Sequence, residues 1–187
     1  MRGTEHCNSW RLSQWRSAIG EFVIYLIPAL LLRMWLWGEW PRRELVLQSF
    51  VVVILAFSLS QIIPIFWQYP RRFVMGLGHA LIFHAPDSSF PSDHAAVFSA
   101  LEITLLMGSE GVLAVLTIIA GIAVAWARIF LGVHFPLDML GVGFVASADS
   151  VPVAPLWQLA GAQIVETMLK LYRHLLSKPI SLGWIKG

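Results

Sequence analysis

The chain has 187 residues, of which 57% are hydrophobic and only 13% are charged, and its formal net charge is +2. Soluble domains carry about 25% charged residues, so the composition excludes an ordinary soluble domain and predicts an integral membrane protein. The small and scattered positive charge gives no support for a nucleic-acid partner. A single cysteine excludes a framework of intrachain disulfides.

Five apolar segments follow one another along the chain. Because the hydrocarbon core of a bilayer requires about 20 apolar residues per helix, we expect an all-α, polytopic transmembrane helix bundle. The expectation is a single integral membrane domain over residues 1–187 with five spans, a sixth being left open. The segments cover residues 22–37, 45–67, 91–108, 111–127 and 139–161.

The flanking and connecting residues complete this expectation. Residues 1–20 are expected to lie along the membrane surface, and the first segment to remain as an uncleaved anchor. The short turn at residues 108–111 predicts an antiparallel hairpin of the third and fourth segments. The polar run at residues 147–152 predicts a kink or an early end in the fifth segment. Residues 163–187 are interpreted as a basic cytoplasmic tail.

The basic residues predict how the bundle is oriented. Five spans place Arg42, Arg43 and the C-terminal tail on one side of the membrane. Residues 68–90 and 128–138 then lie on the other side. Because cytoplasmic loops carry the excess of Lys and Arg, the first side is predicted to be cytoplasmic and the second to face outward.

Three polar clusters fall on the predicted outward side, at residues 69–73, 90–94 and 128–138. Ionisable residues are costly in a membrane-like chain, so they are functional candidates by default. Arginines that hold an anion, together with two histidines, His94 and His134, suit chemistry on phosphate. Their convergence from distant parts of the chain predicts a phosphatase site at the outer face of the bundle.

Local spacing refines the prediction. Pro91 and Pro136 are each expected at the first position of a helix, where proline is preferred, so that two helix N-termini face one anion site. Ser92 is expected in the first turn of one of these helices, as a donor to phosphate. Asp138 lies four residues after His134 and is expected to accept a hydrogen bond from its ring, leaving the other nitrogen free to attack.

These clusters resemble the three signature motifs of the type-2 phosphatidic acid phosphatase superfamily. The family pattern reads Lys-x6-Arg-Pro, then Pro-Ser-Gly-His, then Ser-Arg-x5-His-x3-Asp. The third motif is matched by Arg128, His134 and Asp138 with the same spacing, and the second by residues 91–94. The variant Phe-Pro-Ser-Asp-His at residues 90–94 is closer still to bacterial undecaprenyl-diphosphatases of the bacitracin-resistance type.

The resemblance implies a role for each matching residue. His134 would attack the terminal phosphorus and form a phosphohistidine, with Asp138 orienting its ring. His94 would protonate the departing lipid phosphate and then activate water. Arg71, Arg128 and Ser92 would hold the phosphate oxygens. The resemblance implies no metal and no cofactor.

The sequence also departs from the family pattern. Ala127 replaces the serine of the third motif, Pro64 stands where the first motif has lysine, and Arg72 replaces the proline after Arg71. Arg72 is therefore a hypothetical substitute for the missing lysine in binding phosphate. Asp93 replaces the glycine of the second motif, and with Glu21 it is expected to lie near the site without reacting.

The resemblance implies an enzyme that hydrolyses undecaprenyl diphosphate to the monophosphate and inorganic phosphate. This reaction recycles the lipid carrier of cell-wall (peptidoglycan) synthesis and confers bacitracin resistance. The expected partners are a polyprenyl diphosphate and the bilayer of the bacterial cytoplasmic (inner) membrane, with the site facing the periplasm or the exterior. Two alternatives stay open, a phosphatase for glycerophospholipid phosphates and a lipid phosphotransferase on the same scaffold. The sequence leaves the oligomeric state open.

Overall fold

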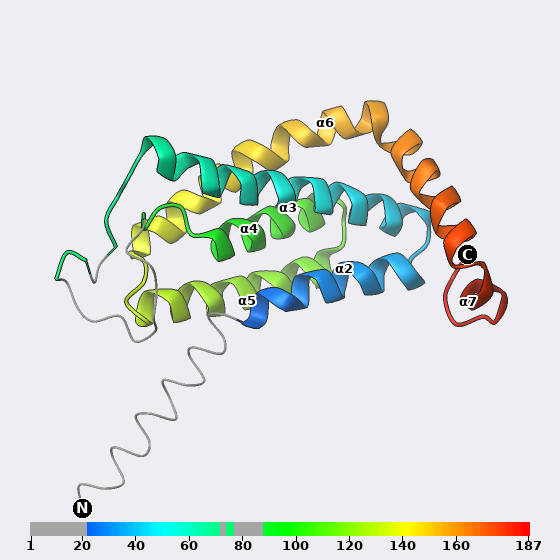
Figure 1. The fold of residues 1–187 in the computed structure, drawn as a ribbon, viewed down its shortest axis with the longest axis horizontal. Helices are drawn as coiled ribbons and strands as arrows, with labels where there is room; N and C mark the ends of the chain where they lie inside the picture. The colour runs from blue at the N-terminus through cyan, green and yellow to red at the C-terminus, as the bar shows by residue number, and fades with distance from the viewer. Residues whose placement is uncertain (1–21, 72–73, 77–87) are drawn as a thin grey trace, which may run out of the picture.

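The computed structural model describes residues 22–71, 74–76 and 88–187, and in this part of the chain it is almost entirely helical (Figure 1). The described residues form no strand beyond an isolated antiparallel bridge between Pro70 and Ser88. The predicted all-α fold is confirmed, whereas residues 1–20 lie outside the described residues. The elements are the 3-10 helix η1 (Val23–Tyr25) and the helices α2 (Leu26–Trp37), α3 (Trp40–Phe66), α4 (Asp93–Met107), α5 (Gly111–Phe130), α6 (Pro136–Leu175) and α7 (Ser177–Ser181).

Helix α4 is the centre of the bundle. It packs against α3, α5 and α6, while α2 packs mainly against α3 (Figure 1). The small residues Ala96 and Ala100 and the large residues Leu101 and Leu105 of α4 are all fully buried. Because α4 is covered on several sides, nearly every turn of it contributes to the core, and the other helices are arranged around it.

Three helices are long and apolar enough to cross a membrane by length and composition, namely α3, α5 and α6. The stretch Val23–Trp37 is apolar but shorter. Helix α4 has 15 residues and rises roughly 22 Å, whereas a bilayer core is roughly 30 Å thick. All five apolar segments are therefore helical, but the central one is too short to span the hydrocarbon core by itself.

The fifth apolar segment differs from the prediction, because α6 continues through residues 147–152 for a total of 40 residues. The hydroxyls of Ser147 and Ser150 donate to carbonyls one turn earlier in the same helix, so these polar side chains do not end it. Pro152 and Pro155 each remove one backbone donor, and α6 changes direction in its second half (Figure 1). The early end is wrong, and the change of direction lies beyond residues 147–152, where the kink was expected.

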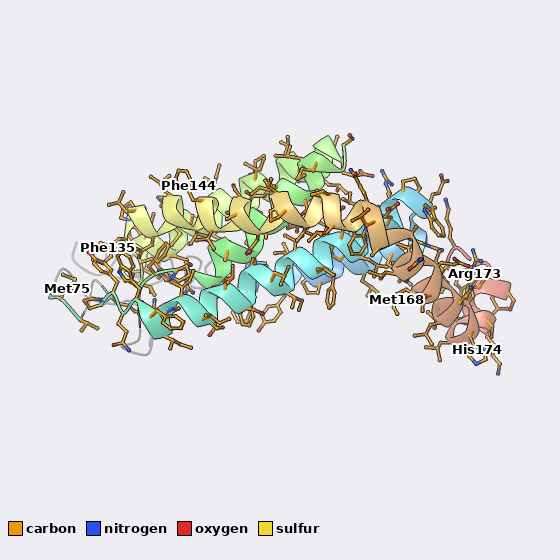
Figure 2. The ribbon with its side chains drawn as sticks, turned by 90° about the horizontal axis from the view of Figure 1, so that it is seen from above. Met75, Phe135, Phe144, Met168, Arg173 and His174 are labelled. Carbon is orange, nitrogen blue, oxygen red and sulfur yellow. The ribbon has the colours of Figure 1, made fainter. Side chains whose placement is uncertain are left out.

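The predicted basic tail is also mostly helical, because residues up to Leu175 belong to α6 and α7 follows. Figure 2 shows Arg173 and His174 at the end of the molecule opposite Phe135 and Met75. The predicted hairpin of α4 and α5 is confirmed. Its turn includes Ser109 at a φ of 60°.

Arg43 joins this end of the bundle together. It is only 3% exposed, and its guanidinium donates to the carbonyls of Trp35 (3.0 Å), Lys186 (2.6 Å) and Gly187 (3.2 Å). The guanidinium also lies 5.0 Å from the centre of the Tyr172 ring, and the Tyr172 hydroxyl donates to the same Lys186 carbonyl. One buried cation therefore holds together α2, α3, α6 and the residues after α7.

We expect Arg43→Ala to lower the free energy of unfolding by at least about 3 kcal/mol, because several charge-assisted hydrogen bonds are lost and their buried acceptors remain. The backbone amide of Lys186, which donates to the Leu36 carbonyl, should also exchange with solvent faster. Thermal unfolding and hydrogen exchange in detergent would measure both effects. The matched control is Arg42→Ala, which removes a side chain that is 56% exposed and paired with Glu110 and should cost no more than about 1 kcal/mol. If the two variants lowered the free energy of unfolding equally, Arg43 would not hold this end of the bundle together as inferred.

Candidate active site

The predicted polar clusters meet at one end of the bundle. The C-terminal ends of α3 and α5 and the N-terminal ends of α4 and α6 lie together there (Figure 1). We use the term His134 cluster for Arg71, Ser89, Arg128, His134 and Asp138, which contact one another across these ends. The convergence expected from three distant segments is present.

The end of α5 places His134. Gly132 has a φ of 75°, a conformation that glycine adopts without a steric cost. Its amide donates to the Ile129 carbonyl, and the amide of Val133 donates to the Arg128 carbonyl. This pair of bonds is the Schellman motif, which ends a helix and reverses the chain. The reversal brings His134 back over the last turn of α5, beside the Arg128 side chain.

The His134 imidazole is 1% exposed, and both its nitrogens have polar partners. Nδ1 lies 2.7 Å from the Ser89 carbonyl oxygen. Because a carbonyl can only accept, Nδ1 carries the hydrogen, and Nε2 is left with its lone pair. Nε2 lies 3.3 Å from Nη1 of Arg71 and 3.3 Å from Nη2 of Arg128. The unprotonated nitrogen therefore faces two guanidinium groups.

Asp138 contacts the residues that surround the His134 ring. Its Oδ2 accepts hydrogen bonds from the Phe135 amide at 2.8 Å and from the Ser89 hydroxyl. It lies 3.7 Å from Nδ1 of His134, close enough for electrostatic attraction but too far for a hydrogen bond. Asp138 is therefore near the imidazole as its spacing predicts, but the direct acceptor of the ring hydrogen is the Ser89 carbonyl.

Ser89 is the residue that the sequence analysis missed. It is fully buried and contacts the imidazole through its carbonyl and Asp138 through its hydroxyl. Its position directly before the Phe-Pro-Ser-Asp-His run is the only sequence signal that pointed to it. A backbone carbonyl leaves no signature in residue type, so its contact with His134 depends on the fold.

Arg71 is positioned by the short pairing of two loop segments. Pro70 forms the bridge with Ser88, and the Ser89 amide donates to the Tyr69 carbonyl at 2.6 Å. This pairing joins the residues after α3 to those before α4. Arg71 is 5% exposed, and its Nη1 lies 3.4 Å from the Val133 carbonyl, next to Nε2 of His134. Arg72 lies outside the described residues, so its predicted contact with phosphate stays a prediction.

The start of α4 differs by two residues from the prediction. Ser92 has an extended backbone with a ψ of 117°, so it is the N-cap and α4 begins at Asp93. Pro91 therefore precedes the helix, whereas Pro136 is the first residue of α6 as expected. The Ser92 hydroxyl is buried without a hydrogen-bond partner among the described residues. His94 is the second residue of α4 and is half-buried.

Asp93 has a structural contact. Its Oδ1 accepts hydrogen bonds from the Ser60 hydroxyl at 2.8 Å and from the Gln61 amide at 2.9 Å. These bonds join the first residue of α4 to the last turns of α3. The carboxylate that replaces the family glycine therefore contacts a neighbouring helix. Glu21, the other residue predicted near the site, lies outside the described residues.

The surroundings of His134 favour its neutral form. Burial lowers the pKa of the imidazole below its ordinary value, and the Arg128 and Arg71 guanidiniums act in the same direction, against the opposing effects of Asp138 and the Ser89 carbonyl. In the described part of the chain, no three His, Cys, Asp or Glu side chains form a group that could hold a metal ion.

Comparison with known proteins identifies the class. The PAP2 superfamily matches residues 45–159, which is more than half of the chain and includes the whole His134 cluster. The chain belongs to the PAP2 superfamily.

Three curated relatives are similar to this chain, two of them over nearly their whole length. The undecaprenyl-diphosphatase BcrC of Bacillus subtilis is 30% identical over 95% of this chain and 91% of its own. YbjG of Escherichia coli, which is named as a candidate undecaprenyl-diphosphatase, is 30% identical over 90% of this chain and 85% of its own. An undecaprenyl-diphosphatase of Sulfolobus acidocaldarius is 33% identical over 45% of this chain and 41% of its own. No solved structure matches the chain significantly.

Ser89→Ala tests the role of the missed residue. It removes one of two donors to the buried Asp138 carboxylate, and a loss of about 1–3 kcal/mol predicts a roughly ten- to hundredfold lower kcat with little change in KM. The neighbouring Ser88→Ala is the control, because the Ser88 hydroxyl bonds to backbone groups of Tyr69 and Phe90 and not to Asp138. In an Asp138→Asn background, Ser89→Ala should have little further effect on kcat. If the effects of the two substitutions on kcat were fully additive, Ser89 would not act through Asp138.

The lowered pKa of His134 predicts a titration midpoint below the ordinary value of about 6.5. The unfolded chain then binds the proton first as pH falls. The stability contributed by His134 is therefore present above about pH 6.5 and is lost as pH falls from there to the folded pKa. NMR of histidine-labelled protein in detergent would measure the midpoint, with His134→Asn identifying the signal. Arg128→Gln should raise the midpoint, and an unchanged midpoint in that variant would disagree with the electrostatic cause.

Proposed function

We propose that this protein hydrolyses undecaprenyl diphosphate, or a closely similar polyprenyl diphosphate, to the monophosphate and inorganic phosphate. The observation that carries the proposal is the environment of Nε2 of His134, a buried and unprotonated nitrogen that faces two guanidinium groups. A nucleophile with two cations beside it suits attack on an anionic phosphorus, because the same cations stabilise the charge that develops on the phosphate oxygens.

The first chemical step forms a bond from Nε2 of His134 to the terminal phosphorus and breaks the bond from that phosphorus to the bridging oxygen. His94 donates a proton to the bridging oxygen, so the lipid monophosphate leaves. The product on the enzyme is a phosphohistidine. Ser89 and Asp138 keep the ring oriented, and the Ser89 carbonyl holds the hydrogen on Nδ1.

The second step returns the enzyme to its starting state. His94, now neutral, takes a proton from water while the water oxygen bonds to phosphorus and the bond to Nε2 breaks. Inorganic phosphate leaves, and the imidazole of His134 is neutral again. Arg71, Arg128 and Ser92 hold the non-bridging oxygens through both steps. The buried Ser92 hydroxyl, which has no partner among the described residues, supports its role as a donor to the substrate.

The substrate class rests on the relatives, since the proposed role of the His134 cluster concerns only the phosphate groups and not the lipid chain. BcrC and YbjG are both named for undecaprenyl diphosphate and match nearly the whole chain. The proposal includes recycling of the lipid carrier for cell-wall synthesis and, with it, bacitracin resistance.

The orientation that we propose places the site outside the cytoplasm, in the bacterial cytoplasmic membrane. The described basic residues beyond the His134 cluster support it, because Arg42, Arg43, Arg173 and Lys186 gather at the opposite end of the bundle. An excess of Lys and Arg marks the cytoplasmic side.

The test is phosphate release by purified protein from undecaprenyl diphosphate, phosphatidic acid and phosphatidylglycerol phosphate, with a chelator present. We expect fastest release from undecaprenyl diphosphate, a loss of roughly a thousandfold or more in His134→Ala, and an acid-labile phosphohistidine that is absent from this variant. Ser88→Ala serves as the active control. Preference for a glycerophospholipid phosphate, or transfer of labelled phosphate to an added acceptor lipid in place of water, would establish one of the alternatives instead. Activity lost in chelator and restored by a divalent cation would overturn the mechanism.

A further inference from the structure

A groove follows α4 away from the His134 cluster. Helices α5 and α6 each pack against α4 more extensively than against each other, so one face of α4 is left between them. Two adjoining cavities of about 370 Å³ each occupy this position and share Ser99, Glu102 and Leu140. Together they form what we term the α4 groove, which has α4 as its floor and α5 and α6 as its walls.

The α4 groove begins beside the proposed catalytic residues. Its lining includes Ala95, Ile129 and Met139, which directly follow His94, Arg128 and Asp138 in the sequence. The loop that carries His134 joins α5 to α6 at this end of the groove. A diphosphate bound at His134 therefore has the groove as an adjoining path for the rest of the molecule.

The walls of the α4 groove suit a hydrocarbon chain. Ile122 and Trp126 on α5 and Leu140 and Phe144 on α6 are 52–79% exposed, and Phe144 lies on the outer side of α6 (Figure 2). Gly143 lines the groove, and a Cβ placed on it would meet nothing within 4 Å. The space is thus open beside an apolar rim that faces the bilayer.

Glu102 marks the far part of the groove. It lies eight residues after His94 on the same helix, roughly 12 Å along the axis, and with Ser99 and Ser147 it makes this part polar. A Cβ at Gly121 would collide with Oε1 of Glu102, so the glycine leaves the room that the carboxyl group occupies. A carboxyl group is a poor neighbour for hydrocarbon, and the apolar part of the groove ends there.

We propose that the α4 groove binds the isoprene units nearest the diphosphate, and that Glu102 ends this binding, so that the remaining chain passes into the bilayer. The proposal rests on the proposed function and adds to it a chain-binding site of limited length. A larger cavity of about 450 Å³ between α2 and α3 is apolar too, but none of its lining residues is next to a member of the His134 cluster.

The first test uses Gly143→Leu, which fills the cavity of the groove that also contains Glu102. The control is Ala148→Leu, which adds a similar side chain on an exposed position of the same helix. We expect Gly143→Leu to raise KM roughly tenfold or more for farnesyl diphosphate and equally for undecaprenyl diphosphate, because both lose the same buried methylene contacts. Dimethylallyl diphosphate should be unaffected, which also shows that the variant is folded. An equal loss for all three substrates, or a loss confined to undecaprenyl diphosphate, would overturn the proposal.

The second test uses Glu102→Leu, which makes the far part of the groove apolar. We expect the KM for undecaprenyl diphosphate to fall severalfold relative to that for farnesyl diphosphate, because the farnesyl chain ends at this part of the groove and only the longer chain continues along the added apolar surface. An unchanged ratio would show that Glu102 does not end the groove.

A third arm separates this proposal from the proposed function. Binding of farnesyl diphosphate to the His134→Ala protein, with and without Gly143→Leu, requires no turnover. Weaker binding in the double variant supports the groove even if the wild-type protein releases no phosphate. Unchanged binding would overturn the proposal. A change of oligomeric state caused by Gly143→Leu would also overturn it, because the groove would then be assigned to the packing of a second copy.

Discussion

The whole site depends on how one imidazole is held. The Ser89 carbonyl accepts the hydrogen of Nδ1 in His134, and this single contact decides that Nε2 keeps its lone pair between Arg71 and Arg128. Burial strengthens the effect, because a protonated imidazole would be costly in a dry site beside two cations. A bound phosphate would complete the arrangement by placing negative charge where the guanidiniums meet. In the proposed mechanism, the nucleophile and the anion site are therefore one structure.

The helices serve this arrangement by bringing four helix ends to one place. The Schellman motif at Gly132 reverses the chain after α5, and Asp138 bonds to the Phe135 amide at the start of α6. At the opposite end, the buried Arg43 joins α2, α3, α6 and the residues after α7. The central helix α4 contacts the helices on each side and carries Ser92 and His94 at its start. Rigidity at both ends thus supports a site built from distant segments.

Much of this could be predicted from residue types and spacing. Apolar segments predicted every long helix, and the spacing of Arg128, His134 and Asp138 predicted three members of the cluster. Other features left no local signal. The polar run at residues 147–152 suggested an early end of α6, yet its serine hydroxyls bond to their own helix and the helix continues. Pro91 suggested a helix start, but the extended backbone of Ser92 delays it. Asp93 suggested a carboxylate near the phosphate, but its direction depended on Ser60 and Gln61 of α3.

The sequence by itself determined the class of protein and the residues proposed for the site, because hydropathy and the spacing of motif residues are properties of the chain. Only the tertiary structure decided which nitrogen of His134 is free, since that depends on a backbone carbonyl 45 residues away in the chain. It also decided that Ser89 and Arg43 have central structural roles, and that a groove along α4 adjoins the site. These features arise where backbone groups and helix surfaces from distant segments come into contact. Such contacts leave no signal in the residues near them in the sequence.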